Sequence, residues 1–242
     1  MTEPSLNPDL LYRARFVMLP GLDGSGLLFR PWLEVMPDAV HRQVFAYPPD
    51  RLLGYDELAQ WVADRIEGEP DEPLVLVGES FGGPLALRVA AAMGDRVQAV
   101  VLVATFGRSP MWPWLCRALA LPVRLVPPWR WILRLALGDR TTPPALLDLA
   151  QEALARTDRR VLAGRVREVA AVQSDALLQA LPVPLMYIQA KRDRLVGPGS
   201  LERLRRVRPD LHAVTFDAPH LVTQHQPEAT WQAVKAWLGS LA

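Results

Sequence analysis

The sequence predicts an α/β fold of three layers, in which a predominantly parallel sheet of about six strands carries helices on both faces. Three observations predict this fold: the chain has 242 residues, 50% of them are hydrophobic, and short apolar runs alternate with helical patterns. A chain of this length can bury a full core as one domain. Alternation of strand and helix implies parallel strands joined by right-handed crossovers. We therefore expect residues 1–242 to form a single domain.

The predicted strands are apolar runs rich in β-branched residues. Most of them are continuous instead of alternating with polar residues, which is typical of strands buried on both faces. Six such runs predict the number of strands. They are Arg15–Leu19, Arg42–Tyr47, Pro73–Gly78, Val97–Thr105, Pro184–Ala190 and His212–Phe216.

Helical patterns fill the intervals between these strands. Tyr55–Glu67 places Leu58, Val62 and Ile66 along one helical face. Phe81–Met93 is small and apolar, as expected for a helix buried against a sheet. The later helices are predicted at Leu201–Val207 and Gln224–Leu238.

The segment from Gly107 to about Leu181 interrupts this alternation, because it contains no strand candidate. It holds four of the eight tryptophans and two helical patterns that start near Pro143 and Asp158. We interpret roughly residues 107–181 as a helical cap inserted over the carboxyl edge of the sheet.

Composition narrows the class of protein. The 27 basic and 26 acidic side chains nearly cancel, which gives no reason to expect nucleic acid as a partner. The single cysteine, Cys116, excludes an internal disulfide and a cysteine-rich zinc site. The N-terminal segment lacks the basic and apolar regions of a signal peptide, and no apolar run approaches the roughly 20 residues of a membrane span. We expect a cytoplasmic protein.

A serine stands among three glycines where the third predicted strand meets a helix, in GESFGG (Gly78–Gly83). A strand that turns directly into a helix strains the residue at the turn, so the residues two positions away must be small. Gly78 and Gly82 occupy those positions around Ser80. This G-x-S-x-G pattern is that of a nucleophile elbow and predicts Ser80 as a nucleophile; a tight turn without a chemical role is the alternative.

A serine hydroxyl needs a base, and the base needs a group that orients it. Among the four histidines, His220 follows the last predicted strand in a short loop and is favoured over His225 in the last helix. For the orienting acid, Asp193 follows the fifth strand and is favoured over Asp175 and Asp217. Along the chain, the order Ser80, Asp193, His220 is the order nucleophile, acid, base that is expected when each residue follows the end of its own strand.

The reaction also needs donors for the oxyanion that forms on the substrate. We expect one donor to be the backbone N–H of Phe81, directly after the nucleophile. The other is expected from the loop after the first strand, LPGLDGSG, as the backbone N–H of Leu22. Asp23 and Ser25 are expected to fix this loop through hydrogen bonds of their own.

Taken together, the segments GESFGG, AKRDRLV and DAPHL resemble the α/β-hydrolase superfamily in their order and surroundings, over nearly the whole chain. Within that superfamily, the chain resembles small bacterial serine esterases with a short helical cap. The resemblance implies a six-stranded sheet that lacks the first two strands usual in the family. It also implies an oxyanion loop that departs from the common His-Gly form, because Pro20 replaces the histidine.

The leading functional hypothesis is a serine hydrolase that cleaves carboxylic esters through Ser80, His220 and Asp193 and an acyl-enzyme, without cofactor or metal. The substrate would be a small-molecule acyl ester. The alternatives are an acyl-thioesterase or acyltransferase on carrier-bound acyl groups, and a non-catalytic binding module that reuses the fold. An acyl carrier protein would be the partner in the second case, and the basic run Arg203–Arg208 could receive it or could be a solvated helix face.

The tryptophan-rich part of the cap allows three interpretations. Its aromatic rings can pack within the cap, line an acyl pocket, or rest on a membrane interface beside nearby arginines. The residues concerned are Trp112, Trp114, Trp129 and Trp131, with Arg117, Arg124, Arg130 and Arg134.

Overall fold

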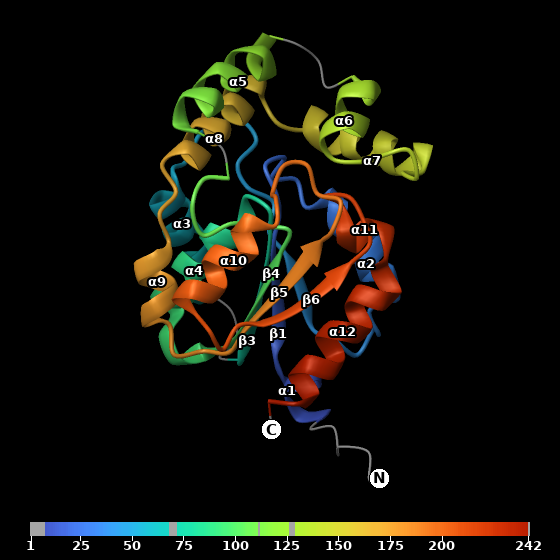
Figure 1. Cartoon of the computed structure of the whole chain (residues 1–242). Coiled ribbons are helices and arrows are strands. Elements are labelled where there is room, and N and C mark those ends of the chain that lie inside the picture. Colours follow the sequence, from blue (N-terminus) through green and yellow to red (C-terminus); the bar gives the residue numbers. More distant parts are fainter. Residues whose placement is uncertain (1–7, 68–71, 111, 126–128, 242) are drawn as a thin grey trace.

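The computed structural model describes residues 8–67, 72–110, 112–125 and 129–241 and confirms the α/β fold of three layers (Figure 1). Six strands form one sheet in the order β2-β1-β3-β4-β5-β6, and every neighbouring pair is parallel. The strands are β1 (Arg15–Leu19), β2 (Arg42–Val44), β3 (Leu74–Glu79), β4 (Val97–Val103), β5 (Leu185–Ala190) and β6 (His212–Phe216).

Helices cover both faces of the sheet. Successive residues of a strand point to opposite faces, so β3 divides its side chains between two cores. Leu74 and Leu76 belong to the core under α3 (Tyr55–Glu67), α4 (Gly82–Met93) and α10 (Gly199–Val207). Val75 and Val77 belong to the core under α1 (Pro8–Arg13), α2 (Arg30–Val35) and α12 (Pro227–Gly239). Burial on both faces is what the continuous apolar runs predicted.

All six predicted strands are present, although β2 ends at Val44 instead of Tyr47. β2 lies at the edge of the sheet and pairs only with β1, through three residues. The predicted last helix is broken into α11 (Val222–His225) and α12, which begins at Pro227. The prediction of one helix from Gln224 was wrong because the residue before a proline is disfavoured in helical conformation, and Gln226 (φ −136°, ψ 59°) lies outside the helical region.

In the described part of residues 107–181, the regular elements are helices and an isolated antiparallel bridge between Arg108 and Gln173. The predicted helices near Pro143 and Asp158 correspond to α7 and α8. Figure 1 shows α5 to α8 beyond the edge at which the strands end. The helices are α5 (Pro113–Leu125), α6 (Arg130–Ala136), α7 (Pro144–Ala155), α8 (Arg159–Ala170) and α9 (Asp175–Ala180). Two 3₁₀ turns, Leu27–Phe29 and Gly94–Arg96, complete the elements.

The register of the sheet brings four loops to one edge. Neighbouring strands end at paired positions, so the segments that follow β1, β3, β5 and β6 leave the sheet at the same edge. The terminal pairs are Leu19 with Gly78, Glu79 with Val103, Val103 with Ile188, and Ala190 with Phe216. Along the described ranges, none of the helices is long and apolar enough to cross a bilayer.

Candidate active site

Ser80 occupies the turn between β3 and α4 in a left-handed conformation, with φ of +52°. Residues other than glycine rarely adopt this conformation, so the surroundings must hold it in place. The Ser80 N–H donates to the Val103 carbonyl (2.9 Å), and the Thr105 hydroxyl donates to the Ser80 carbonyl (2.5 Å). Both backbone groups of the strained residue are therefore fixed by β4 and the residues after it.

The glycines around Ser80 are required by close backbone contacts. A side chain at Gly78 would overlap the carbonyl of Gly82, and one at Gly82 would overlap the carbonyl of Leu19. The backbones of β1, β3 and the start of α4 therefore lie so close together that no Cβ atom fits at Gly78 or Gly82. This contact is the physical reason for the G-x-S-x-G spacing.

The structure brings Ser80, His220 and Asp193 together. The His220 Nε2 lies 3.0 Å from the Ser80 Oγ, and its Nδ1 lies 2.7 Å from the Asp193 Oδ2. The other oxygen of Asp193 accepts hydrogen bonds from the backbone N–H groups of Leu195 (2.8 Å) and Val196 (2.9 Å). The side chains of His220 and Asp193 are 3% and 1% exposed, whereas Ser80 is partly exposed. The outcome is a buried, oriented imidazole that faces an accessible hydroxyl.

Two opposing effects act on the protonation of His220. Burial lowers its pKa, but the charge of Asp193 and the hydrogen bond to it raise the pKa more, so the net pKa lies above 6.5. A smaller contribution in the same direction comes from the Glu79 carboxylate. The raised pKa means that the His220 imidazole accepts a proton more readily than a free histidine does.

The alternative candidates lie elsewhere. His225 bonds the Thr142 hydroxyl through Nε2 (3.0 Å), and burial lowers its pKa. Asp175 accepts a hydrogen bond from Arg108 (2.8 Å) at the start of α9. Asp217 pairs with Arg192. None of the three takes part in the Ser80–His220–Asp193 chain of hydrogen bonds.

The loop after β1 runs beside Ser80. A Cβ atom built on Gly21 would lie 3.7 Å from the Ser80 Cβ, in ordinary contact. Within the described residues, the backbone N–H groups of Leu22 and Phe81 donate to no other protein group. Two donors thus remain available beside the serine. The expected bonds within the loop are present, because Asp23 Oδ2 accepts from the Ser25 N–H (2.8 Å) and hydroxyl (2.5 Å).

A buried arginine that the sequence analysis missed holds this loop from the cap. Arg165 of α8 is 2% exposed and donates to the carbonyls of Leu22 (2.9 Å) and Asp23 (2.9 Å) through Nη1. Its Nη2 donates to the Pro48 carbonyl (3.1 Å). The Thr157 hydroxyl donates to the Asp23 carbonyl as well (2.6 Å). The backbone that carries the Leu22 N–H is therefore attached to α8 and to Thr157, which lies two residues before that helix.

A buried carboxyl group lies directly before the serine and was also missed. Glu79 is 3% exposed, and both of its oxygens accept from Gln224 Nε2, at 2.9 and 3.1 Å. Burial raises the pKa of Glu79 to about 7, against smaller lowering effects of the Gln224 hydrogen bond and the His220 charge. In the described ranges, no group of three or more His, Cys, Asp or Glu side chains is arranged to hold a metal.

Residues 16–233 match the model of the alpha/beta hydrolase family. This match covers most of the chain, which therefore belongs to that family. The family shares the fold described above, with its parallel sheet and its functional loops at the carboxyl edge.

Similarity to individual proteins is more limited. A 115-residue stretch is 35% identical to phytyl ester synthase 1, chloroplastic, of Arabidopsis thaliana, and covers 45% of this chain and 16% of that protein. A 101-residue stretch is 31% identical to lipase LipV of Mycobacterium tuberculosis, and covers 37% of this chain and 36% of that protein. The crystal structure of a hydrolase from Pseudomonas aeruginosa superposes with a TM-score of 0.80 at 18% identity, over 94% of this chain and 90% of that one. The matched stretches thus span well under half of these two curated relatives, and the solved structure supports the fold.

Proposed function

We propose that the protein is a serine esterase, in which Ser80, His220 and Asp193 form a catalytic triad that cleaves carboxylic esters. The observation that carries this proposal is the continuous chain of hydrogen bonds from the Asp193 carboxylate through the His220 ring to the Ser80 hydroxyl. A buried acid, a base of raised pKa and an accessible hydroxyl are the parts that nucleophilic acyl transfer needs.

In the proposed reaction, the Ser80 Oγ forms a bond to the substrate carbonyl carbon while its proton passes to His220 Nε2. The tetrahedral intermediate then collapses, the bond to the alcohol oxygen breaks, and His220 returns the proton to the leaving alcohol. Water attacks the acyl-enzyme by the same route, releases the carboxylic acid and restores Ser80. The Asp193 carboxylate stabilises the imidazolium that forms in both steps.

The backbone N–H groups of Leu22 and Phe81 are the donors for the oxyanion in this proposal. Support comes from their position beside Ser80 and from the lack of another partner for either group among the described residues. The loss of one such donor typically lowers the rate by about 10²–10³. The contacts that fix the Leu22 backbone therefore bear on the chemistry, although they touch no substrate.

The first experiment measures initial rates on p-nitrophenyl esters from acetate to laurate, with covalent labelling by a fluorophosphonate. We expect turnover with a maximum at one chain length, and labelling that Ser80→Ala abolishes while the circular dichroism spectrum stays native. His220→Ala is expected to lower kcat almost as much. Labelling that persists in Ser80→Ala would place the nucleophile elsewhere, and a native chain that neither turns over esters nor labels would favour the binding-module alternative.

The acid can be assigned with three matched amide variants. Asp193→Asn is expected to lower kcat by about 10⁴, because the amide favours the wrong tautomer of His220. Asp175→Asn and Asp217→Asn should stay within a few-fold of the parent, since their partners are Arg108 and Arg192. The opposite ranking of these variants would show that Asp193 is not the acid.

A second candidate function is acyl transfer to an alcohol instead of water. The similarity to a protein named phytyl ester synthase favours it over thioester hydrolysis. The same acyl-enzyme would serve, with an alcohol oxygen attacking in the second step. The ratio of new ester to free acid, measured with a long-chain alcohol present, distinguishes the two: mostly acid supports the esterase, and mostly ester supports the transferase.

A further inference from the structure

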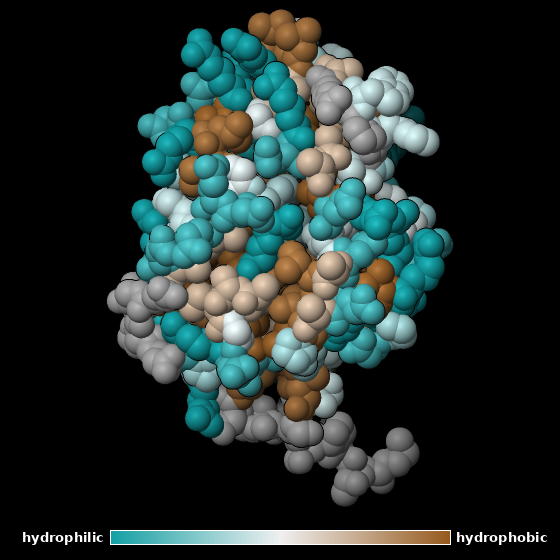
Figure 2. Space-filling view, turned by 90° about the vertical axis from the view of Figure 1, so that its left-hand side faces the viewer, coloured by the Kyte–Doolittle hydropathy of each residue, from teal (hydrophilic) through white to brown (hydrophobic). Residues whose placement is uncertain are grey.

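The outer surface of the cap exposes an unusual number of large apolar side chains. In the described part of the chain, eight of the ten exposed large hydrophobic residues lie between residues 112 and 135. Trp112 is 73% exposed and Trp114 is 65% exposed, which contradicts the interpretation that they pack within the cap. Figure 2 shows hydrophobic side chains at the surface of the cap end of the molecule. The other six are Leu119, Leu121, Leu125, Trp129, Trp131 and Leu135.

The exposure follows from a helix that is apolar on two opposite faces. Cys116 and Ala120 of α5 are buried in the core that also contains α8. On the opposite side, Trp114, Leu121 and Leu125 follow one another at helical spacing and all face solvent. A helix that is apolar all round is normally buried, so the outward face of α5 lacks a covering partner in the described structure.

α6 continues this surface. Trp131 and Leu135 are four residues apart, which places them on one helical face, and they are 63% and 58% exposed. Leu133 points the other way into the core with α7. The rings of Trp129 and Trp131 stack at a centroid distance of 6.2 Å. We call the exposed apolar side chains of residues 112–135 the outer face.

The charged residues in the segment that carries the outer face are all basic. No aspartate or glutamate occurs from residue 96 to residue 138, whereas several arginines do. Arg124 and Arg134 lie in the last turns of α5 and α6, and Arg130, which starts α6, is half exposed beside Asp148 (3.2 Å). The outer face thus combines exposed indoles and leucines with a basic border.

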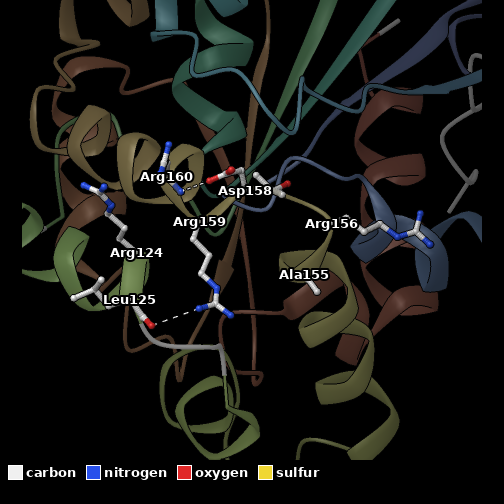
Figure 3. Close-up of a pocket in the computed structure, with 8 residues that line it drawn as sticks. Arg124, Leu125, Ala155, Arg156, Asp158, Arg159 and Arg160 are labelled. Atoms are coloured by element: carbon white, nitrogen blue, oxygen red, sulfur yellow. Dashed lines mark hydrogen bonds between the residues drawn. The ribbon is translucent and has the colours of Figure 1, made fainter.

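A depression lined by arginines adjoins the outer face at Leu125. Its volume is about 540 Å³, and it lies where α5 ends beside the start of α8 (Figure 3). Within the described residues, Arg124, Arg159 and Arg160 have no carboxylate at ion-pair distance. The one acid in the depression, Asp158, accepts from the Arg160 N–H (2.6 Å) and caps α8. Figure 3 shows the Arg159 side chain directed toward Leu125 and the Arg160 side chain pointing away from it, so the arginines offer separate contacts to the phosphates of anionic headgroups.

From these observations we propose that the outer face and the adjoining arginines dock the protein on an anionic lipid surface. The indoles and leucines would enter the boundary between headgroups and acyl chains, and Arg124, Arg159 and Arg160 would pair with phosphates. A bilayer fits better than an acidic protein, because the apolar side chains are the larger part of the surface and follow two helices. The proposal concerns binding and does not depend on the esterase assignment.

The test is cosedimentation of the full chain with vesicles of phosphatidylcholine alone or mixed with phosphatidylglycerol. We expect binding to the mixed vesicles that weakens as sodium chloride is raised, because salt screens the arginines and not the apolar contacts. Trp114→Gln combined with Leu121→Gln should lower the partition coefficient by about tenfold or more. Tyr12→Ser is the matched control, since Tyr12 is 46% exposed on α1 at the opposite end of the molecule (Figure 1).

A second pair of variants tests the charges. The double variant Arg159→Gln, Arg160→Gln should weaken binding to mixed vesicles by about fivefold for each arginine. Arg205→Gln, Arg206→Gln removes an equal, adjacent pair from α10 and should change binding much less. No binding to mixed vesicles would overturn the proposal, and so would equal losses in the two arginine pairs. Self-association of the lipid-free chain that Leu121→Gln abolishes would assign the outer face to a second copy instead.

Discussion

Two regions of this molecule reverse the usual distribution of polar and apolar side chains. Around Ser80, the charged groups Arg165, Glu79 and Asp193 are buried. On the outer face of α5 and α6, large apolar groups such as Trp114 and Leu121 are exposed. Buried polar groups and exposed apolar patches are the observations that carry information about function, because ordinary surfaces and cores do not need them.

The two regions differ in what holds them. Each buried charge near Ser80 has specific hydrogen-bond partners, so its position is fixed at the cost of desolvation. The outer face has no such contacts and contributes little to folding. Substitutions in the first region should therefore affect both stability and chemistry, whereas substitutions in the second should affect neither.

Among the substitutions that test this contrast between the two regions, Arg165→Met is expected to have the largest effect. The substitution leaves the carbonyls of Leu22, Asp23 and Pro48 without their buried donor, which should lower the free energy of unfolding by about 2–4 kcal/mol. Because the Leu22 backbone would no longer be fixed, kcat should fall by about 10² while KM changes little. Urea unfolding and steady-state kinetics at a temperature well below the transition measure the two effects separately.

Arg167→Met is the matched control, because Arg167 is exposed on the same helix. It should match the parent in both measurements. Arg165→Lys is expected to behave like Arg165→Met, since one ammonium group cannot reach three carbonyls. An Arg165→Met protein that is less stable but keeps its kcat would show that this residue supports the fold alone and does not position the oxyanion loop.

A smaller effect is expected from Glu79→Gln, and it concerns the pH profile. Protonated His220 cannot accept the Ser80 proton, so kcat/KM should fall as the pH drops through the His220 pKa, which lies above 6.5. The Glu79 charge helps to raise that pKa, and the glutamine removes the charge. The midpoint of the acid limb should therefore move to lower pH.

Glu202→Gln removes an exposed carboxylate from α10 and should leave the midpoint unchanged. A shift of the Glu79→Gln midpoint to higher pH would contradict the electrostatic argument. An unchanged midpoint would mean that Glu79 is already neutral in the pH range of the limb, which is possible only if its pKa lies well above the value of about 7.

The sequence predicted the parts of the molecule that depend on local patterns. Continuous apolar runs identified the strands, and the spacing of Gly78 and Gly82 identified the turn at Ser80 because the backbone contacts there exclude side chains. Chain order and strand ends pointed to Asp193 and His220, which the fold brings within hydrogen-bond distance of one another. Their catalytic role is still a prediction.

The sequence analysis missed residues whose burial depends on which side of a helix or strand faces inward. Arg165 looks like one more charged position of α8, although it shares a helical face with the buried Leu162 and Val169. That spacing was the available signal. Arg208 was likewise grouped with a basic run, but it is buried and donates to the carbonyls of Leu178 and Leu181. For Arg208, only the tertiary structure distinguishes the buried arginine from its solvated neighbours.

The smallest expected effect is on the free energy of unfolding when side chains of the outer face are replaced. Trp114→Gln and Leu121→Gln should each change the free energy of unfolding by less than about 0.5 kcal/mol, because both side chains are already in solvent. Ala120→Gln lies one residue away, on the buried side of α5, and should cost about 2–3 kcal/mol through overpacking and a buried amide. A cost for Leu121→Gln as large as that for Ala120→Gln would mean that the outer face is covered in the free protein. In that case the apolar groups on α5 would belong to the core, and the contrast with the buried charges around Ser80 would no longer hold.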